Sequence, residues 1–310
     1  MNLVNKRIAA LLLLFGLSQL SGVAPCPQAM AQTPRVSQAK FILGDYDKEP
    51  RIGDHVDTDR LVKRLSELGA NTYMWLIWHN KNDWNDLKTF LPKANAAGIS
   101  VWVYLVPPSE TPMNNAAFNY SEPFKADYVS WAKEISSLSL ENKNLVGYVI
   151  DDFWGNVVTN RLLLTPRFTP DNIKRMVLAG KQINPKIKFY PLMYFNQIDN
   201  KQFVNVWEPL VDGVVAAYPP SVDAVRHISS VTLNQSRRIP LIVMVASDGK
   251  ILSKFSHVSG TQDNVEKGVQ DMLALAKNGE IEGVITYCLD LSDTSAMFLK
   301  VKNAYTSRVQ

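Results

Sequence analysis

The chain has 310 residues, of which 46% are hydrophobic and 20% charged, and its formal net charge is +4 at pH 7. Acidic and basic residues are mixed along the chain, which excludes a concentrated basic face, so no nucleic-acid partner is expected. The sequence has no low-complexity segment and no long linker after about residue 40, which favours one large folded domain.

The first predicted element is a secretory signal peptide. Lys6 and Arg7 precede the apolar run Ile8–Phe15, and a stretch of small residues ends at Ala31. We therefore expect removal of residues 1–31, leaving a mature domain of residues 32–310 that is secreted or periplasmic. The apolar run is too short to span a bilayer, and no later stretch reaches the roughly 18 to 20 apolar residues of a membrane helix. No membrane insertion is expected once the leader is removed.

Beyond the leader, short runs rich in β-branched and aromatic residues alternate with helix-like stretches. Eight such runs occur, in chain order Lys40–Leu43, Thr72–Trp78, Ser100–Val106, Val146–Ile150, Lys188–Met193, Gly213–Ala217, Leu241–Val245 and Gly283–Leu289. Several are apolar at nearly every position, which is typical of parallel strands covered on both faces. Eight strand-helix units predict an α/β fold with a single (β/α)8 barrel, the TIM barrel. An open, doubly wound sheet is the alternative.

Capping residues mark several of the helices between these runs. One helix is predicted to begin at Asp57 and to end at Gly69, with Leu61, Leu65 and Leu68 on one face. Further helices are predicted over Asp86–Ala97, from Thr169-Pro170 onward, and over Val265–Lys277.

The residues that follow each strand matter most, because in such a barrel the active site lies at the C-terminal ends of the strands. Carboxyl, amide and aromatic side chains dominate these positions. Glycoside hydrolysis needs this chemistry, since carboxyl groups act on the bond and aromatic faces pack against sugar rings. We expect a carbohydrate substrate, bound by Asp45, Trp78, His79, Trp154, Asn156, Tyr194, Asn196, Tyr218, Asp248 and Asp290.

Asp151 and Asp152 give the sharpest signal. They directly follow the apolar run Val146–Ile150, and adjacent carboxylates repel one another unless one keeps its proton or a cation lies between them. Carboxyl groups whose pKa values are pushed apart suit acid/base catalysis. Successive strand residues point to opposite faces, so both can face the barrel only if the backbone turns, for which nearby Gly155 is suited. The alternative is that one Asp caps the next segment and the other pairs with Arg or Lys.

The segment Gly147–Phe153 resembles the strand-four signature of glycoside-hydrolase barrels, especially the family 84 β-N-acetylglucosaminidases, in which two consecutive aspartates end that strand. The resemblance covers about seven residues beside a similar barrel order. It implies that Asp151 orients and polarises the substrate's 2-acetamido group and that Asp152 is the general acid/base.

A substrate without an acetamido group would need a second carboxylate from another strand. Glu110, our third catalytic candidate, follows two prolines that stiffen its loop; Asp45, Asp248 and Asp290 are the other choices. Three of these have a plainer interpretation: Glu110 as an exposed loop acid, Asp290 as a helix cap and Asp45 as a turn former. Any single Trp or Tyr can also be core packing, which we expect of Trp75 and Trp102 because they lie within predicted strands.

Competing functions are a metal-dependent hydrolase and an exported glycan-binding barrel without catalysis. A metal site could draw on Asp45, Asp47, Asp151, Asp152 and His79, but none of the four histidines lies in an H-x-H or H-x-x-x-H pattern, so no metal is expected. No cofactor is expected either, because phosphate-cradling glycine motifs are absent after the first strand. With the leader removed, Cys288 is the only cysteine, which excludes an intramolecular disulfide. Oligomeric state is left open.

Overall fold

A computed structural model describes residues 41–110, 121–157, 168–231 and 239–307. The expected signal peptide and the first residues of the expected mature domain lie outside these ranges. Within them, no helix is both long enough and apolar enough to cross a membrane.

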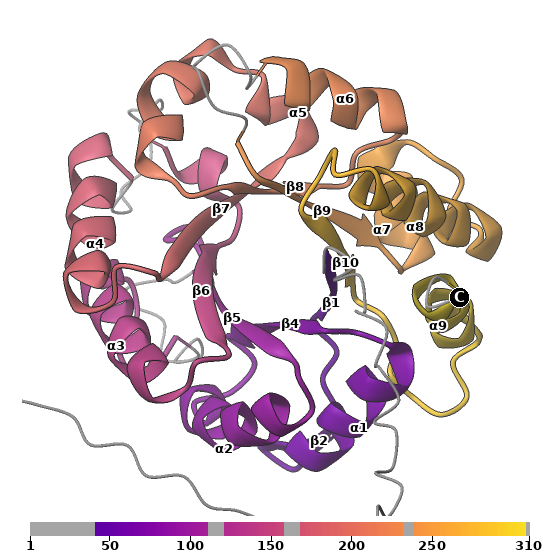
Figure 1. The fold of residues 1–310 in the computed structure, drawn as a ribbon, viewed down its shortest axis with the longest axis horizontal. Helices are drawn as coiled ribbons and strands as arrows, with labels where there is room; N and C mark the ends of the chain where they lie inside the picture. Colours follow the sequence, from indigo (N-terminus) through magenta and orange to yellow (C-terminus); the bar gives the residue numbers. More distant parts are fainter. Residues whose placement is uncertain (1–40, 111–120, 158–167, 232–238, 308–310) are drawn as a thin grey trace, which may run out of the picture. The chain divides into compact units, whose positions relative to one another are not determined.

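In the described residues, eight parallel strands close into a barrel that helices surround (Figure 1). Each barrel strand pairs with the next one along the chain, and the last pairs with the first. The strands are β1 (Ile42–Tyr46), β4 (Thr72–Ile77), β5 (Ser100–Leu105), β6 (Leu145–Ile150), β7 (Lys188–Tyr194), β8 (Val214–Ala217), β9 (Leu241–Ala246) and β10 (Gly283–Tyr287). A small antiparallel hairpin of β2 (Arg51–Ile52) and β3 (His55–Val56) follows β1. The predicted TIM barrel is confirmed, and the open sheet is excluded.

All eight predicted strands are present, with ends that differ by a few residues. The difference that matters most is at β1, which was expected to end at Leu43 and instead continues to Tyr46. Asp45 therefore lies within a strand. Because strand side chains alternate between the two faces, Asp45 points to the face opposite to that of its neighbours.

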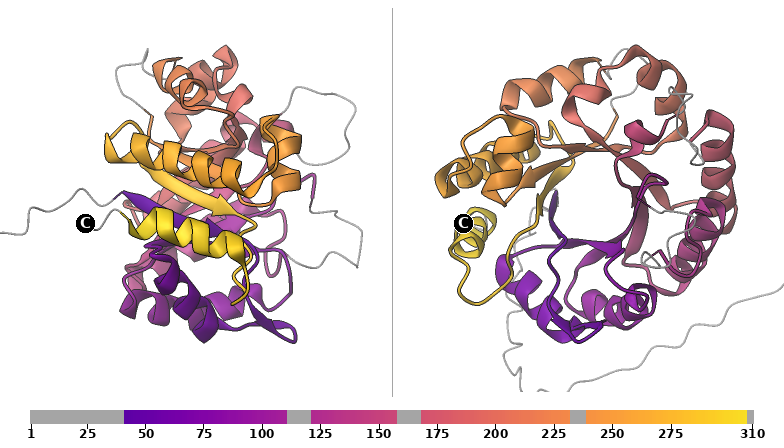
Figure 2. Two further views of the ribbon diagram at one scale, coloured as in Figure 1. Left: turned by 90° about the vertical axis from the view of Figure 1, so that its right-hand side faces the viewer. Right: turned by 180° about the vertical axis from the view of Figure 1, so that it is seen from behind.

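The helices are α1 (Thr58–Leu68), α2 (Asp83–Ala96), α3 (Tyr128–Glu141), α4 (Pro170–Ile183), α5 (Phe195–Ile198), α6 (Val222–Val231), α7 (Gly249–Ser256), α8 (Gln262–Lys277) and α9 (Ala296–Thr306). Short 3-10 or π turns cover Phe153–Asn156, Phe203–Trp207 and Glu208–Leu210. In the side view of Figure 2, the last two helices, coloured gold to yellow, lie along the outside of the strands.

Helix α1 illustrates how the local sequence sets these elements. The side chain of Asp57 accepts a hydrogen bond from the first turn, and Gly69 ends the helix at φ 79°, a left-handed conformation that suits glycine. Leu61, Leu65 and Leu68 are fully buried on one face, each worth about 1.5–3 kcal/mol of burial free energy.

Two further helix starts bear on the site. Helix α4 begins as predicted, with Thr169 capping it and Pro170 in the first turn. Helix α2 begins at Asp83 rather than Asp86, and the buried Asp83 carboxylate accepts hydrogen bonds from the backbone N–H groups of Trp78 and Asn80. The start of α2 therefore holds the loop that follows β4.

Two apolar layers stabilise the barrel, and strand residues alternate between them. Trp75 lies in the outer layer, between strands and helices, and Trp102 lies in the inner layer, inside the barrel. Both are buried, as predicted for core residues. Gly147 on β6 makes room for Trp102, because a Cβ there would lie 2.4 Å from the indole ring.

Candidate functional site

A cavity of about 290 Å³ opens at the C-terminal ends of the barrel strands. Its walls come from the last residues of the strands and from the loops that follow them, as expected for a barrel of this kind. Four carboxyl side chains line it: Asp47, Glu110, Asp151 and Asp152. Six aromatic side chains line it as well: Tyr46, Trp78, Tyr194, Tyr218, Phe255 and Tyr287.

Asp151 and Asp152 both line the cavity because the backbone turns between them and the next segment. Asp152 has φ 39° and ψ 38°, in the left-handed region that Asp tolerates better than most residues. Gly155, the turn residue expected from the sequence, lies in the following 3-10 turn and does not have a positive φ. The turn is therefore at Asp152 itself.

Asp151 is the more deeply placed of the pair. Its Oδ2 accepts a hydrogen bond from the Tyr46 hydroxyl at 3.2 Å, and its Oδ1 accepts one from the Asp152 N–H at 2.8 Å. Burial, together with the charges of Asp152 and Glu110, raises the pKa of Asp151 to about 8. At neutral pH this carboxyl group mostly keeps its proton.

Asp152 and Glu110 share the same surroundings. Burial raises the pKa of Asp152, although a hydrogen bond with the Tyr194 hydroxyl acts to lower it. Glu110 is solvent-exposed along part of its length, but burial of its carboxyl and the charge of Asp152 raise its pKa too. We call Glu110, Asp151 and Asp152 the β5–β6 cluster, since they follow those strands.

Asn156 holds the two loops of this cluster together. It is only 2% exposed, its Oδ1 accepts a hydrogen bond from the Ser109 N–H, and its Nδ2 donates to Ser109 Oγ and to the Asp152 carbonyl. Its polar atoms are therefore occupied by the protein. We assigned Asn156 to substrate binding, whereas the structure gives it a role in positioning the backbone of Asp152 beside the Glu110 loop.

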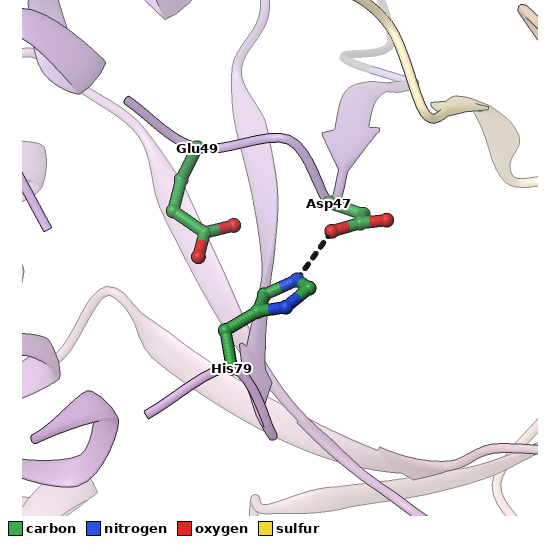
Figure 3. Close-up of side chains that lie close together, drawn as sticks. All are labelled: Asp47, Glu49 and His79. Carbon is green, nitrogen blue, oxygen red and sulfur yellow. Dashed lines mark hydrogen bonds and ion pairs between the residues drawn. The ribbon is translucent and has the colours of Figure 1, made fainter. Parts of the chain in front are cut away.

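A second polar group lies across the mouth of the cavity, where β1 and β4 end. His79 Nε2 and Asp47 Oδ1 are 2.6 Å apart, and the Glu49 carboxyl lies on the other side of the imidazole (Figure 3). Arg51 bonds to Glu49 Oε1 at 2.6 Å and to Asp83 Oδ1 at 2.6 Å. We call these five residues the β1–β4 cluster.

The acids of the β1–β4 cluster have cationic partners. Burial acts to raise the pKa of Asp47, but its hydrogen bonds, chiefly with His79, outweigh burial and lower it. The same bond with Asp47 raises the pKa of His79 against the effect of burial. The contact between Asp47 and His79 thus favours the charged form of each side chain, and Arg51 balances Glu49 and Asp83.

Asp47, Glu49 and His79 are also the one group in the described part of the chain with the spacing of a metal site, with ligand atoms within 4.8 Å of one another. Glu49 Oε2 is buried, and among the described residues it has no hydrogen-bond partner. However, the imidazole nitrogen nearest Asp47 is already hydrogen-bonded, and Arg51 holds the other Glu49 oxygen. The trio offers donors for an ion only if these contacts are exchanged.

The aromatic side chains form a connected wall. Tyr46 stacks on Tyr287 with ring centroids 5.1 Å apart, and Tyr218 stacks on Phe255 at 5.3 Å. The Trp78 indole Nε1 is buried and has no acceptor among the described residues. The rings that line the cavity offer faces on which a sugar can pack.

Asp45 does not line the cavity. It is fully buried on the outer face of β1, level with Tyr73 of the next strand, and its Oδ1 accepts a hydrogen bond from Thr286 Oγ1 at 2.6 Å. The physical reason is the twofold alternation of a strand: Tyr46 points into the barrel, so Asp45 points out.

Four more residues that we assigned to substrate binding lie away from the cavity lining. Trp154 packs edge-on against Phe203, and Asn196 is exposed on α5. Asp248 caps α7, and Asp290 accepts hydrogen bonds from Ser292, so local N–H and O–H groups occupy both carboxylates. Trp78, Tyr194 and Tyr218 line the cavity itself. His79 is hydrogen-bonded to Asp47, which also lines it.

Sequence reasoning did not single out Tyr46, Tyr287, Phe255, Glu49 or Arg51. Tyr46 and Tyr287 are the last residues of β1 and β10, so the misplaced end of β1 hid the first of them. Glu49 lies in the loop after β1 and Arg51 begins β2, and their importance depends on contacts with His79 and Asp83, which are distant in sequence.

Comparison with known proteins supports the fold. No family model matches the sequence, and no curated protein matches it. Among solved structures, a glucosidase from Croceicoccus marinus has a TM-score of 0.59 and 11% identity, covering 87% of this chain and 67% of that one. The catalytic core of xylanase A has a TM-score of 0.56 and 13% identity, covering 87% and 99%. A family 5 mannosidase from Rhizomucor miehei has a TM-score of 0.54 and 9% identity, covering 87% and 94%. At such identities the likeness shows a shared barrel.

Proposed function

We propose that this chain is a glycoside hydrolase that uses carboxyl groups of the β5–β6 cluster for acid/base catalysis on a carbohydrate substrate. The observation that carries the proposal is the pair Asp151 and Asp152, which line one ring-walled cavity while Asp151 keeps its proton at neutral pH. Glycosidic bond cleavage needs a protonated carboxyl group for the leaving oxygen and an ionised one on the other side of the reaction. The glycosidases that share the barrel fold are consistent with this activity.

Asp151 is suited to the role of the general acid. Its pKa of about 8 means that it holds a proton at neutral pH, yet it is close enough to neutrality to release that proton to a leaving oxygen. The Tyr46 hydroxyl and the Asp152 N–H hold the carboxyl in place. They would also stabilise the carboxylate that forms on proton transfer.

Asp152 and Glu110 are the candidates for the ionised partner. Each lines the cavity, and burial raises the pKa of each carboxyl group, while a hydrogen bond with the Tyr194 hydroxyl acts to lower the pKa of Asp152. In this assignment Asp152 stabilises the oxocarbenium-like transition state or activates water, while the Tyr194 hydroxyl keeps its carboxylate oriented.

The family 84 resemblance implies a different division of labour, with Asp151 polarising an acetamido group and Asp152 acting as the acid/base. Polarising an amide N–H calls for an ionised carboxylate, whereas burial and neighbouring charge favour a protonated Asp151. The structure therefore favours direct acid catalysis by Asp151 over substrate assistance.

The test combines two substitutions with two kinds of substrate. Wild type should release sugar from a panel of chromogenic glycosides and oligosaccharides, and Asp151→Asn and Asp152→Asn should each lose roughly 10²- to 10⁴-fold in kcat/KM. With an aryl glycoside whose phenol is acidic, Asp151→Asn should recover much of its rate, because such a leaving group needs no proton. Recovery by Asp152→Asn instead would reverse the two roles.

A glycan-binding barrel without catalysis is the outcome if wild type binds oligosaccharides but cuts none of the panel. A metal-dependent hydrolase is the second candidate, because Asp47, Glu49 and His79 have suitable spacing. Loss of activity on exhaustive chelation, and its return with one divalent ion, would favour that candidate over the carboxyl pair.

Export is part of the proposal. It rests on the leader-like residues 1–31, which precede the barrel domain. N-terminal sequencing of the protein recovered from the periplasm or medium should read from about Gln32. Recovery of the uncut chain from the cytoplasm alone would contradict export.

A further inference from the structure

Among the described residues, the cavity is lined by carboxyl groups that basic side chains do not match in number. Asp47, Glu110, Asp151 and Asp152 contribute to its walls, and the described part of the lining contains no Lys or Arg. Placing carboxyl groups together in one partly enclosed space is unfavourable, because each disfavours ionisation of the next. A cavity built in this way would repel an anionic sugar such as a uronic acid.

The unfavourable charge is concentrated in the β5–β6 cluster. Asp47 is balanced by His79 at 2.6 Å, but among the described residues no Lys, Arg or His forms an ion pair with Glu110, Asp151 or Asp152. This imbalance is specific to one wall, since the acids of the β1–β4 cluster each have a cationic partner. This wall has no positive group of its own among the described residues, and a ligand could supply one.

A small metal ion fits this wall poorly. Within the ranges that the structure describes, the spacing of a metal site is found at Asp47, Glu49 and His79, not among Glu110, Asp151 and Asp152. The carboxyl groups are spread over the cavity walls, so a cation that contacts several of them must be larger than a metal ion. An organic cation has this size. The cavity, at about 290 Å³, is at the small end of the range for small-molecule sites.

The aromatic wall favours the same kind of ligand. The faces of Tyr, Trp and Phe rings attract ammonium groups, and Tyr46, Tyr194, Tyr218 and Tyr287 all line the cavity. Rings and carboxyl groups together suit a sugar that carries a positive charge.

We propose that the cavity binds a cationic amino sugar, one whose amino group is free rather than acylated, and that the preferred substrate is a glycan containing such residues. The inference rests on the proposed function for the cutting step but not for the binding step. The ammonium group would balance the β5–β6 cluster while the sugar ring packs against the aromatic wall.

The test measures binding and cutting separately. For binding we choose Asp151→Asn, because an amide reproduces the neutral state of that side chain at pH 7 while removing the proposed acid. Its affinity is measured by calorimetry for glucosamine oligomers, for N-acetylglucosamine oligomers of the same length and linkage, and for cello-oligosaccharides. A parallel series with galactosamine oligomers covers the other common amino sugar.

We expect the free-amine oligomers to bind at least tenfold more tightly than their acetylated or neutral counterparts. Their affinity should fall as the salt concentration rises from about 50 to about 500 mM, because salt screens the attraction between charges. The affinity of neutral oligomers should change little. Adding Glu110→Gln should weaken amine binding about tenfold and leave acetylated binding unchanged. The matched control is Glu141→Gln, which removes an exposed acid at the last residue of α3, just before β6 begins at the opposite end of the barrel.

Three results would separate the proposals. Equal or tighter binding of acetylated or neutral oligomers, with wild type cutting them, would overturn the amino-sugar inference and leave the hydrolase proposal standing. Salt-dependent amine binding without cutting by wild type would support the inference and overturn the hydrolase proposal. An equal loss of amine binding in Glu141→Gln and Glu110→Gln would show only an effect of net charge and would also overturn the inference.

Discussion

The two polar clusters at the mouth of the barrel both contain Asp and Glu side chains but differ in charge balance. In the β1–β4 cluster, His79 and Arg51 lie within hydrogen-bond distance of the acids, so the charges are paired inside the protein. In the β5–β6 cluster, no described cation reaches Asp151 or Asp152, and the pKa of Asp151 rises to about 8. The first arrangement favours rigidity, and the second keeps a proton available for chemistry. Perturbed carboxyl groups in a cavity are therefore better functional candidates than the acids of a balanced network.

The largest expected effect comes from replacing one acid in each cluster. Asp152→Asn should reduce kcat/KM roughly 10²- to 10⁴-fold, whereas Asp47→Asn should cost about tenfold, because Asp47 is balanced by His79 and takes no part in proton transfer. Steady-state kinetics on the best substrate of the panel, with circular dichroism to check folding, makes the comparison. An equal loss in both variants would remove the distinction between the clusters.

Removing the balancing cation should affect stability. Arg51→Met leaves Asp83, whose side chain is 0% exposed, without its ion-pair partner. Breaking a fully buried pair costs about 3–5 kcal/mol, and since Arg51 is 21% exposed we expect about 2–3 kcal/mol. Urea unfolding measures the change. The control Arg226→Met removes an exposed pair with Glu280 and should change the free energy of unfolding little; a similar loss in both variants would contradict the role given to Arg51.

Asp151 should make both activity and stability depend on pH. Its folded-state pKa of about 8 lies above the unfolded value of about 3.9, so its contribution to stability is greatest below pH 4 and is lost as pH rises towards 8. Asp151→Asn should therefore be more stable than wild type at pH 8 to 9, by about 1–2 kcal/mol after allowing for solvent screening, and the difference should shrink towards pH 4.

The same group sets the alkaline limit of activity. If Asp151 is the acid, wild-type kcat/KM should fall tenfold per pH unit above about pH 8. Thermal unfolding across pH and a pH–rate profile check the two halves of this prediction. A pH-independent difference in stability, or full activity well above pH 8, would count against the assignment.

The smallest expected effect is that of metal removal. Because His79 and Arg51 already occupy the acids of the β1–β4 cluster, exhaustive chelation should leave kcat/KM within twofold of the untreated value. Glu49→Gln should likewise show no change in its response to chelator. A large loss that a divalent ion restores would mean that the β1–β4 cluster exchanges its internal contacts for a metal.

Much of the fold could be predicted because it depends on local patterns. Apolar runs marked all eight strands, and caps such as Asp57 and Thr169 marked helix starts, since these signals act within a few residues. The position of Asp151 and Asp152 at the end of the fourth barrel strand followed from the same patterns. That two neighbouring acids could both face the cavity depended on a turn, and the turn residue was Asp152 rather than Gly155.

Tertiary structure decided the rest. A shift of β1 by a few residues turned Asp45 outward and brought Tyr46 into the cavity, and local hydrogen bonds occupied Asp248 and Asp290. The sequence by itself determined which residues end each strand to within a few positions, because hydrophobic periodicity is a local property. Only the closed barrel determined which acids meet a cation and which stay unbalanced, because burial and charge pairing arise between segments far apart in the chain.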